Sequence, residues 1–172
     1  PSSHDASGRA GGAVKPAPFE YHVPETVSEA GELLAELGED AKVLAGGQSL
    51  VPMLALRLAV FGHLVDIGRL AELRGVERRD GELWVGACTR QADVERNDEI
   101  AAVPLLAKAT PLIGHFQIRN RGTVGGSIAH ADPAAEYPAV ALTLDATMEV
   151  LSSRRRRTIR ASDFFDGLWT TR

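Results

Sequence analysis

The sequence predicts one domain of mixed helices and strands, arranged in two lobes that meet near residues 68–73. Three observations support this prediction. The 172 residues, 44% of them hydrophobic and 24% charged, are enough for one domain with a sizeable core. The first seventy residues alternate between strand and helix patterns, whereas the remainder contains two hairpin patterns with helices between them.

The composition excludes several classes of protein. A net charge of −4 argues against nucleic acid as the main partner, and no apolar run approaches the roughly 18–20 residues that span a bilayer. No charged and then apolar leader opens the chain, so we expect a cytoplasmic protein. The single cysteine, Cys88, cannot by itself build a disulfide or an iron–sulfur cluster.

The first lobe is predicted to span residues 14–70, after a disordered extension at residues 1–13 that is small, polar and rich in glycine. Thr26 and Glu29 form a capping box, which predicts a helix that starts at Val27. Gly38 is the expected end of this helix.

Two short strands and a second helix complete the first lobe. Residues 42–45 are expected to form a buried strand, and residues 63–67 form another. A helix is expected at residues 51–58, with Pro52 tolerated in its first turn. The resulting β-α-β arrangement places the segment after residue 44 at the end of a strand, where open sheets tend to bind ligands.

The second lobe, residues 71–172, is predicted from hairpin and helix signals. Asp80-Gly81 is a strong hairpin turn between strands at residues 73–78 and 82–87. Further elements are expected as helices at residues 91–96, 103–113 and 133–144, and as a closing hairpin at residues 147–152 and 157–160.

Two glycine pairs with similar neighbours lie about eighty residues apart. They occur in Ala45–Ser49 (AGGQS) and in Thr123–Ser127 (TVGGS), and neither matches a P-loop or the Rossmann fingerprint. Glycines let a ligand approach the main chain, and successive N–H groups in such turns can hold an anion. Either pair alone is typical of an ordinary turn, but together they favour a ligand with a diphosphate, such as a dinucleotide.

Four motifs, in their order and spacing, resemble the flavoprotein (medium) subunit of molybdenum hydroxylases, in the group of aerobic carbon monoxide dehydrogenase and xanthine dehydrogenase. They are Lys15–Tyr21 (KPAPFEY), Ala45–Leu50 (AGGQSL), Gln117–Ser127 (QIRNRGTVGGS) and Ala129–Glu136 (AHADPAAE). The resemblance implies a two-lobed α+β FAD-binding domain of the vanillyl-alcohol-oxidase-like (PCMH) type. The family continues into a C-terminal subdomain that is missing after residue 172, so we expect weaker FAD binding than in a full-length homologue.

The resemblance also implies the cofactor site. The glycine amides would meet the diphosphate of FAD, with hydroxyl groups of Ser49, Thr123 and Ser127 as further donors, and either Asp132 or Glu136 would reach a sugar hydroxyl. The residues expected to bind FAD are Ala45, Gly46, Gly47, Gln48, Ser49, Leu50, Ile113, Gly114, Thr123, Val124, Gly125, Gly126, Ser127, Asp132 and Glu136.

In the family that the sequence resembles, electrons from a molybdenum-cofactor large subunit pass through [2Fe–2S] clusters of a small subunit to FAD, and then to an external acceptor. The resemblance implies that role and those two partners here. It implies no catalytic side chain. Separately, no metal is expected, since His130 and Asp132 alone have poor spacing for metal ligands. The alternative is a truncated, non-catalytic module that keeps the fold and subunit contacts without a working flavin.

The run Arg154–Arg157 is the most conspicuous cluster of charge. It could form a nucleic-acid patch, but it lacks interleaved aromatic residues and lies in a predicted hairpin of an acidic chain. A solvated turn or a contact with a partner subunit is the favoured interpretation, so no nucleic-acid partner is expected.

Overall fold

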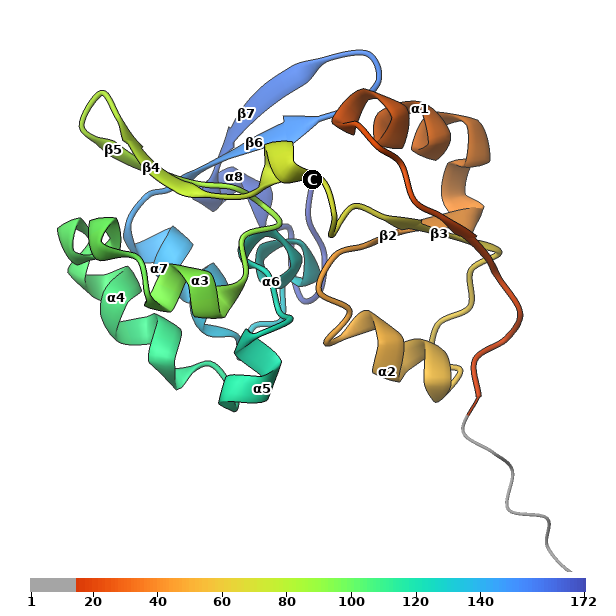
Figure 1. Cartoon of the computed structure of the whole chain (residues 1–172), viewed down its shortest axis with the longest axis horizontal. Helices are drawn as coiled ribbons and strands as arrows, with labels where there is room; N and C mark the ends of the chain where they lie inside the picture. The colour runs from red at the N-terminus through yellow and green to blue at the C-terminus, as the bar shows by residue number, and fades with distance from the viewer. Residues whose placement is uncertain (1–14) are drawn as a thin grey trace, which may run out of the picture.

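The computed structural model describes residues 15–172, and the predicted extension at residues 1–13 lies outside the described part. The N-terminal region forms a parallel three-stranded sheet in the order β1–β3–β2 (Figure 1). Its strands are β1 (Glu20–His22), β2 (Ala41–Leu44) and β3 (His63–Asp66). The predicted β-α-β arrangement is therefore present, with β1 as a strand that the sequence patterns had not indicated.

Helix α1 (Val27–Leu37) forms where the capping box predicts it. The Thr26 hydroxyl oxygen accepts a hydrogen bond from the Glu29 N–H at 3.1 Å, whereas the Glu29 carboxylate accepts from Glu25 rather than from Thr26. Gly38, at φ 63°, ends the helix in a conformation that favours glycine, and a short 3₁₀ turn, η1 (Gly38–Asp40), follows.

The core of this region lies between α1 and the central strand. Ala30, Val65 and Leu70 are buried together, and the other apolar residues of α1 pack around them. Successive residues of a strand point to opposite faces, so Val65 faces α1 while Leu64 and Asp66 face the other side of the sheet. This alternation later decides which side chains of β3 reach the functional site.

Two predictions for this region need correction. Strand β2 was expected to be buried, but it is an edge strand in which Lys42 and Val43 are exposed, Val43 by 38%. Helix α2 (Leu50–Ala55) is shorter than predicted.

The C-terminal region begins with the short 3₁₀ turn η2 (Ala71–Leu73) and the predicted hairpin of β4 (Val76–Arg79) and β5 (Glu82–Val85). Asp80 and Gly81, both at positive φ, form its turn. The helical elements that follow are α3 (Gln91–Glu95), η3 (Asp98–Ala102), α4 (Pro104–Ala109), η4 (Thr110–Leu112), α5 (Phe116–Arg119), α6 (Val124–His130) and α7 (Glu136–Thr143). The predicted helix at residues 133–144 thus begins three residues late.

The chain closes with the hairpin of β6 (Thr147–Leu151) and β7 (Arg156–Arg160), followed by α8 (Ala161–Phe164). The arginine run lies in the turn and the start of β7, and Arg156 pairs with Glu149 of β6 at 3.1 Å. In Figure 1 this hairpin reaches over to α1, and a β-carbon on Gly31 would lie 3.1 Å from the Ser153 nitrogen. The two regions therefore touch where α1 meets the closing hairpin. The lobe boundary near residue 70 stays a prediction.

No helix in residues 15–172 has the length and apolar character that a membrane crossing requires.

Candidate functional site

The two glycine motifs lie against each other. The first follows β2, and the second begins α6. A β-carbon on Gly46 would lie 2.3 Å from the Arg121 carbonyl oxygen and 2.9 Å from the Gly122 α-carbon. Only glycine fits this approach, so the loop after β2 packs directly on the segment that leads into α6. The predicted diphosphate site requires the two motifs to lie together in this way.

The first motif presents free main-chain donors. Gly47 has a φ of 70°, which turns the chain sharply after Gly46. Within the described residues, the main-chain N–H groups from Gly46 to Ser49 donate to no protein acceptor. A run of unpaired N–H groups at a turn is the arrangement that holds an anion.

The second motif differs from the expected loop, because it is the start of helix α6. Its glycine N–H groups are already used: Gly125 donates to the Ala87 carbonyl at 2.8 Å, and Gly126 donates to the Thr123 hydroxyl oxygen at 3.1 Å. A β-carbon on Gly125 would lie 2.6 Å from the Ala87 β-carbon. These glycines therefore serve close packing, and diphosphate binding by their amides stays a prediction.

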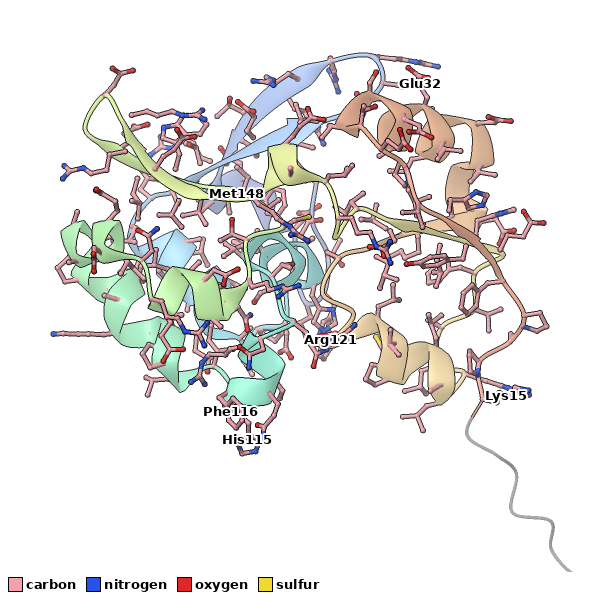
Figure 2. All side chains as sticks on the ribbon, viewed as in Figure 1. Lys15, Glu32, His115, Phe116, Arg121 and Met148 are labelled. Atoms are coloured by element: carbon pink, nitrogen blue, oxygen red, sulfur yellow. The ribbon has the colours of Figure 1, made fainter. Side chains whose placement is uncertain are left out.

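Two cavities adjoin the first motif, and both are lined by Gly46 and Arg121. The larger, of about 280 Å³, is lined by Tyr21, Ala45, Gly46, Asp66, Gly68, Arg69, Arg74, Cys88, Arg90, Arg121 and Thr123. The smaller, of about 240 Å³, is lined by Gly46, Gly47, Gln48, Val51, Pro52 and Arg121. Figure 2 shows Arg121 between helices α5 and α2, at the junction of the two regions. We call these two cavities together the cleft.

The cleft is rich in arginine. Four guanidinium groups line it, and Asp66 is the one carboxylate among the lining residues. Arg69, Arg90 and Arg121 form no ion pair with any acidic side chain of the described part. Unpaired guanidinium groups beside free main-chain donors suit an anionic ligand such as a phosphate ester.

Asp66 is held by neighbours on its own side of the sheet. It accepts hydrogen bonds from the Gly68 N–H at 2.8 Å and from the Tyr21 hydroxyl. The hydrogen bond to Asp66 is the largest cause of a raised pKa for Tyr21. Tyr21 therefore remains a neutral donor at the edge of the cleft through ordinary pH.

Cys88 is a buried thiol in the wall of the larger cavity. Its sulfur lies 3.4 Å from the Ile67 carbonyl oxygen. Burial raises the pKa of this thiol to about 11. A thiol that stays protonated is a poor nucleophile, so Cys88 serves packing rather than reaction.

The structure gathers only some of the predicted site residues. Those that line the cleft are Ala45, Gly46, Gly47, Gln48 and Thr123. Ser49, Leu50 and the first residues of α6 adjoin them in sequence. Ile113, Gly114, Asp132 and Glu136 line neither cavity.

The carbonyl groups of Ile113 and Gly114 accept hydrogen bonds from Arg119 at 3.0 and 3.3 Å. Asp132 accepts from the Ala134 N–H in a turn, and Glu136 opens helix α7. Nothing in the described structure chooses between Asp132 and Glu136. The roles of all four remain predictions.

Sequence reasoning missed the polar lining contributed by Tyr21, Asp66 and the four arginines. Arg121 gave a signal, because it stands inside the motif that precedes the second glycine pair. The other arginines lie in separate segments of the chain, and no local sequence pattern indicates that they converge on one cavity.

Comparison with known proteins identifies the class to which this fold and cleft belong. Residues 17–172 match the family described as the FAD-binding domain in molybdopterin dehydrogenase. The chain belongs to this family, and FAD is the family's cofactor, as the sequence motifs predicted.

Named relatives agree with that assignment. The chain is 45% identical over 157 residues to the carbon monoxide dehydrogenase medium chain of Hydrogenophaga pseudoflava, covering 91% of this chain and 55% of the relative. It is 35% identical over 149 residues to the xanthine dehydrogenase FAD-binding subunit of Escherichia coli O157:H7, covering 86% of this chain and 51% of the relative. The chain thus spans about half the length of these relatives.

Solved structures show the same fold. Carbon monoxide dehydrogenase from Hydrogenophaga pseudoflava matches with a TM-score of 0.88 at 46% identity. Quinoline 2-oxidoreductase from Pseudomonas putida 86 matches with a TM-score of 0.88 at 40% identity. Each match covers 91% of this chain and 55% of the other. The predicted mixed α+β architecture is therefore confirmed.

Proposed function

We propose that this chain is the FAD-binding portion of a molybdenum hydroxylase flavoprotein subunit, and that the cleft holds the diphosphate of FAD. The carrying observation is the run of unpaired N–H groups from Gly46 to Ser49, which lies beside cavities lined by arginine. The donor set fits the cofactor, because a diphosphate offers acceptor oxygens and negative charge together.

Each part of the cleft has a separate task. The N–H groups after β2 bind phosphate oxygens from one side. Arg121 lines both cavities and neutralises charge where they meet. Thr123 keeps its hydroxyl hydrogen free, because its oxygen is the acceptor for Gly126, so it can donate from the α6 side.

The remaining side chains orient rather than react. Asp66 and Tyr21 form a fixed hydrogen-bonded pair at the end of β3, which can position a polar group of the cofactor. No side chain of the cleft is required as a general base. When bound, FAD supplies the electron transfer between iron–sulfur clusters and an external acceptor, and the protein provides binding and orientation.

The proposed partners follow from the family. Relatives carry names such as carbon monoxide dehydrogenase medium chain and nicotine 6-hydroxylase medium subunit. We propose a large subunit with the molybdenum cofactor and a small subunit with [2Fe–2S] clusters as partners here. The single cysteine supports this, since the chain cannot supply the thiolates of a cluster itself.

A ligand series tests the proposal. The purified 172-residue chain is titrated with FAD, ADP and riboflavin, and binding is followed by calorimetry. A diphosphate cleft predicts saturable binding of FAD and ADP, with riboflavin at least about ten-fold weaker because it lacks both phosphates. Equal binding of riboflavin and FAD would remove the diphosphate from the proposal.

The second candidate is a non-catalytic module that keeps the fold and subunit contacts. The matched region covers about half of each relative. Co-purification with partner subunits in the absence of flavin, together with no uptake of added FAD, would support this module instead.

A further inference from the structure

Three side chains that can bind a metal meet on the sheet of the first region, outside the cleft. The Nε2 atom of His22 lies 3.1 Å from the Nδ1 atom of His63. The Oε2 atom of Glu20 lies 3.6 Å from that His63 nitrogen and 4.0 Å from the His22 nitrogen. Two imidazoles and one carboxylate thus converge on one point, with all three ligand atoms within 4.8 Å of one another.

The strand register explains why these residues meet. Glu20 lies opposite His63 in the parallel pair of β1 and β3, and His22 follows Glu20 by two residues on the same face. On the other side of His63 the partner residue is Ala41 of β2, whose methyl group leaves space beside the imidazole. The backbone therefore sets the positions of all three ligands.

This cluster is separate from the cleft. His63 shares its face of β3 with Val65, which packs against α1, whereas Asp66 and Tyr21 lie on the opposite face and line the larger cavity. Changes to the cluster can therefore be tested without removing any group that lines the cleft.

The geometry matches that of a small divalent cation. Zinc–nitrogen and zinc–oxygen bonds of about 2.0–2.1 Å in a tetrahedron place ligand atoms about 3.3 Å apart. The observed separations of 3.1, 3.6 and 4.0 Å approach that value, and a small rotation of the exposed Glu20 side chain closes the longest. Imidazole nitrogen with carboxylate oxygen suits Zn²⁺ and its neighbours, whereas Mg²⁺ and Ca²⁺ prefer oxygen ligands.

Burial of the ligands favours occupancy. The side chains of His22 and His63 are only 24% and 23% exposed, while that of Glu20 is 74% exposed. The nitrogen pair is sheltered, and the carboxylate closes the site from the solvent side. A tetrahedral ion held by these three ligands would keep one coordination position for water.

We propose that Glu20, His22 and His63 form a binding site for a divalent transition-metal ion of the Zn²⁺ class, which ties β1 to β3. The ion would link the strand nearest the N-terminus of the described chain to the central strand. The ordinary alternative is a hydrogen bond between two neutral imidazoles with Glu20 nearby, and it needs no ion.

Cobalt substitution tests the site directly. The full 172-residue chain, first treated with a chelator, is titrated with Co²⁺, and the visible absorption of the ion is recorded. We expect bands typical of four- or five-coordinate cobalt that saturate at about one equivalent per chain and disappear when Zn²⁺ is added.

Matched variants assign the ligands. His22→Gln and His63→Gln should each weaken Co²⁺ binding by at least the roughly 10- to 100-fold that loss of an outer-sphere partner alone costs. Glu20→Gln should weaken it less and shift the absorption bands. His115→Ala, which changes a histidine outside the cluster, should bind Co²⁺ as the original chain does.

Two results would overturn the proposal. One is Co²⁺ binding that does not saturate near one equivalent. The other is equal binding by the His22, His63 and His115 variants. A far-ultraviolet circular dichroism spectrum unchanged from that of the original chain shows that a variant is still folded, so a lost metal signal with an unchanged spectrum assigns the effect to the cluster itself.

Discussion

The two glycine pairs are similar in sequence but differ in their main-chain hydrogen bonds and packing in the structure. After β2, Gly46 and Gly47 leave a run of N–H groups without acceptors, and Gly47 takes a positive φ. At the start of α6, Gly125 and Gly126 are helical and donate their N–H groups within the protein. The first pair leaves main-chain donors available, which supports the proposed ligand site, and the second lets two pieces of backbone touch. A shared motif therefore does not imply a shared function.

The packing role of the second glycine pair is tested most directly at Gly125. Gly125→Ala places a methyl group 2.6 Å from the Ala87 β-carbon and 2.8 Å from its carbonyl oxygen. We expect a loss of unfolding free energy of about 2–3 kcal/mol, because overpacking forces backbone to move. Urea denaturation measures it.

Gly126→Ala is the comparison variant. Its methyl group meets chiefly the Thr123 hydroxyl oxygen at 2.7 Å, so the smaller expected cost is the roughly 1 kcal/mol of a disturbed helix cap. An equal loss of stability in both variants would contradict the packing role assigned to Gly125.

Substitution of Arg121 tests whether the cleft binds an anionic ligand. Arg121→Gln should weaken FAD binding about ten-fold, since a charge-assisted hydrogen bond contributes roughly 1.5 kcal/mol. The dependence of FAD affinity on salt should also become shallower. Arg155→Gln, in the exposed turn of the closing hairpin, is the control and should bind FAD normally. Unchanged affinity in the Arg121 variant would remove this residue from the diphosphate site.

Thr123 caps helix α6 and is also proposed to donate a hydrogen bond to FAD. Thr123→Val leaves the Gly126 N–H without its acceptor and should destabilise the fold by about 1 kcal/mol, as loss of a helix cap does. FAD affinity should fall as well, because the free hydroxyl hydrogen is lost. Thr123→Ser should restore both properties. If serine restores stability alone, the hydroxyl caps α6 without contacting the ligand.

The smallest predicted effect is the contribution of the Cys88 thiol to the pH dependence of the unfolding free energy. The pKa of this thiol is raised to about 11 in the folded chain, above that of an unfolded thiol, so the stabilisation is present at low pH and is lost as pH rises. Between about pH 8 and pH 9.5, we expect the unfolding free energy to fall by about 1 kcal/mol from this group.

Cys88→Ala should remove that part of the pH dependence. Tyr21 and Tyr137, whose pKa values are also raised, stay in both proteins and cancel in the comparison. Identical slopes in the two proteins would show that the buried thiol does not titrate in this way.

Local signals predicted local structure well. The capping box and Gly38 set the ends of α1, and Asp80-Gly81 set the β4–β5 turn, because each depends on only a few neighbouring residues. The meeting of the two glycine motifs could also be predicted from the family resemblance. The ends of α1 and the β4–β5 turn are the parts of the fold in which sequence and backbone are coupled over short distances.

Tertiary packing determines the elements for which the sequence-based prediction and the structure differ. Two glycines disfavour a helix by about 1 kcal/mol each, so sequence favoured a loop at Thr123–Ser127, yet contact with Ala87 makes helix α6 the better solution. Strand β2 was expected to be buried, but its place at the sheet edge leaves Val43 exposed.

The two histidines of the proposed metal site gave no signal either. They are 41 residues apart, and only the β1–β3 pairing brings them together. No window of sequence short enough to show a pattern contains both.

The contact between Gly31 and Ser153 has a consequence for biosynthesis. Helix α1 lies early in the chain, but one of its neighbours belongs to the last hairpin, more than a hundred residues later. While the ribosome is still making the middle of the domain, that side of α1 has no cover. We therefore expect the nascent N-terminal half to be a target for chaperones and proteases until β6 and β7 emerge.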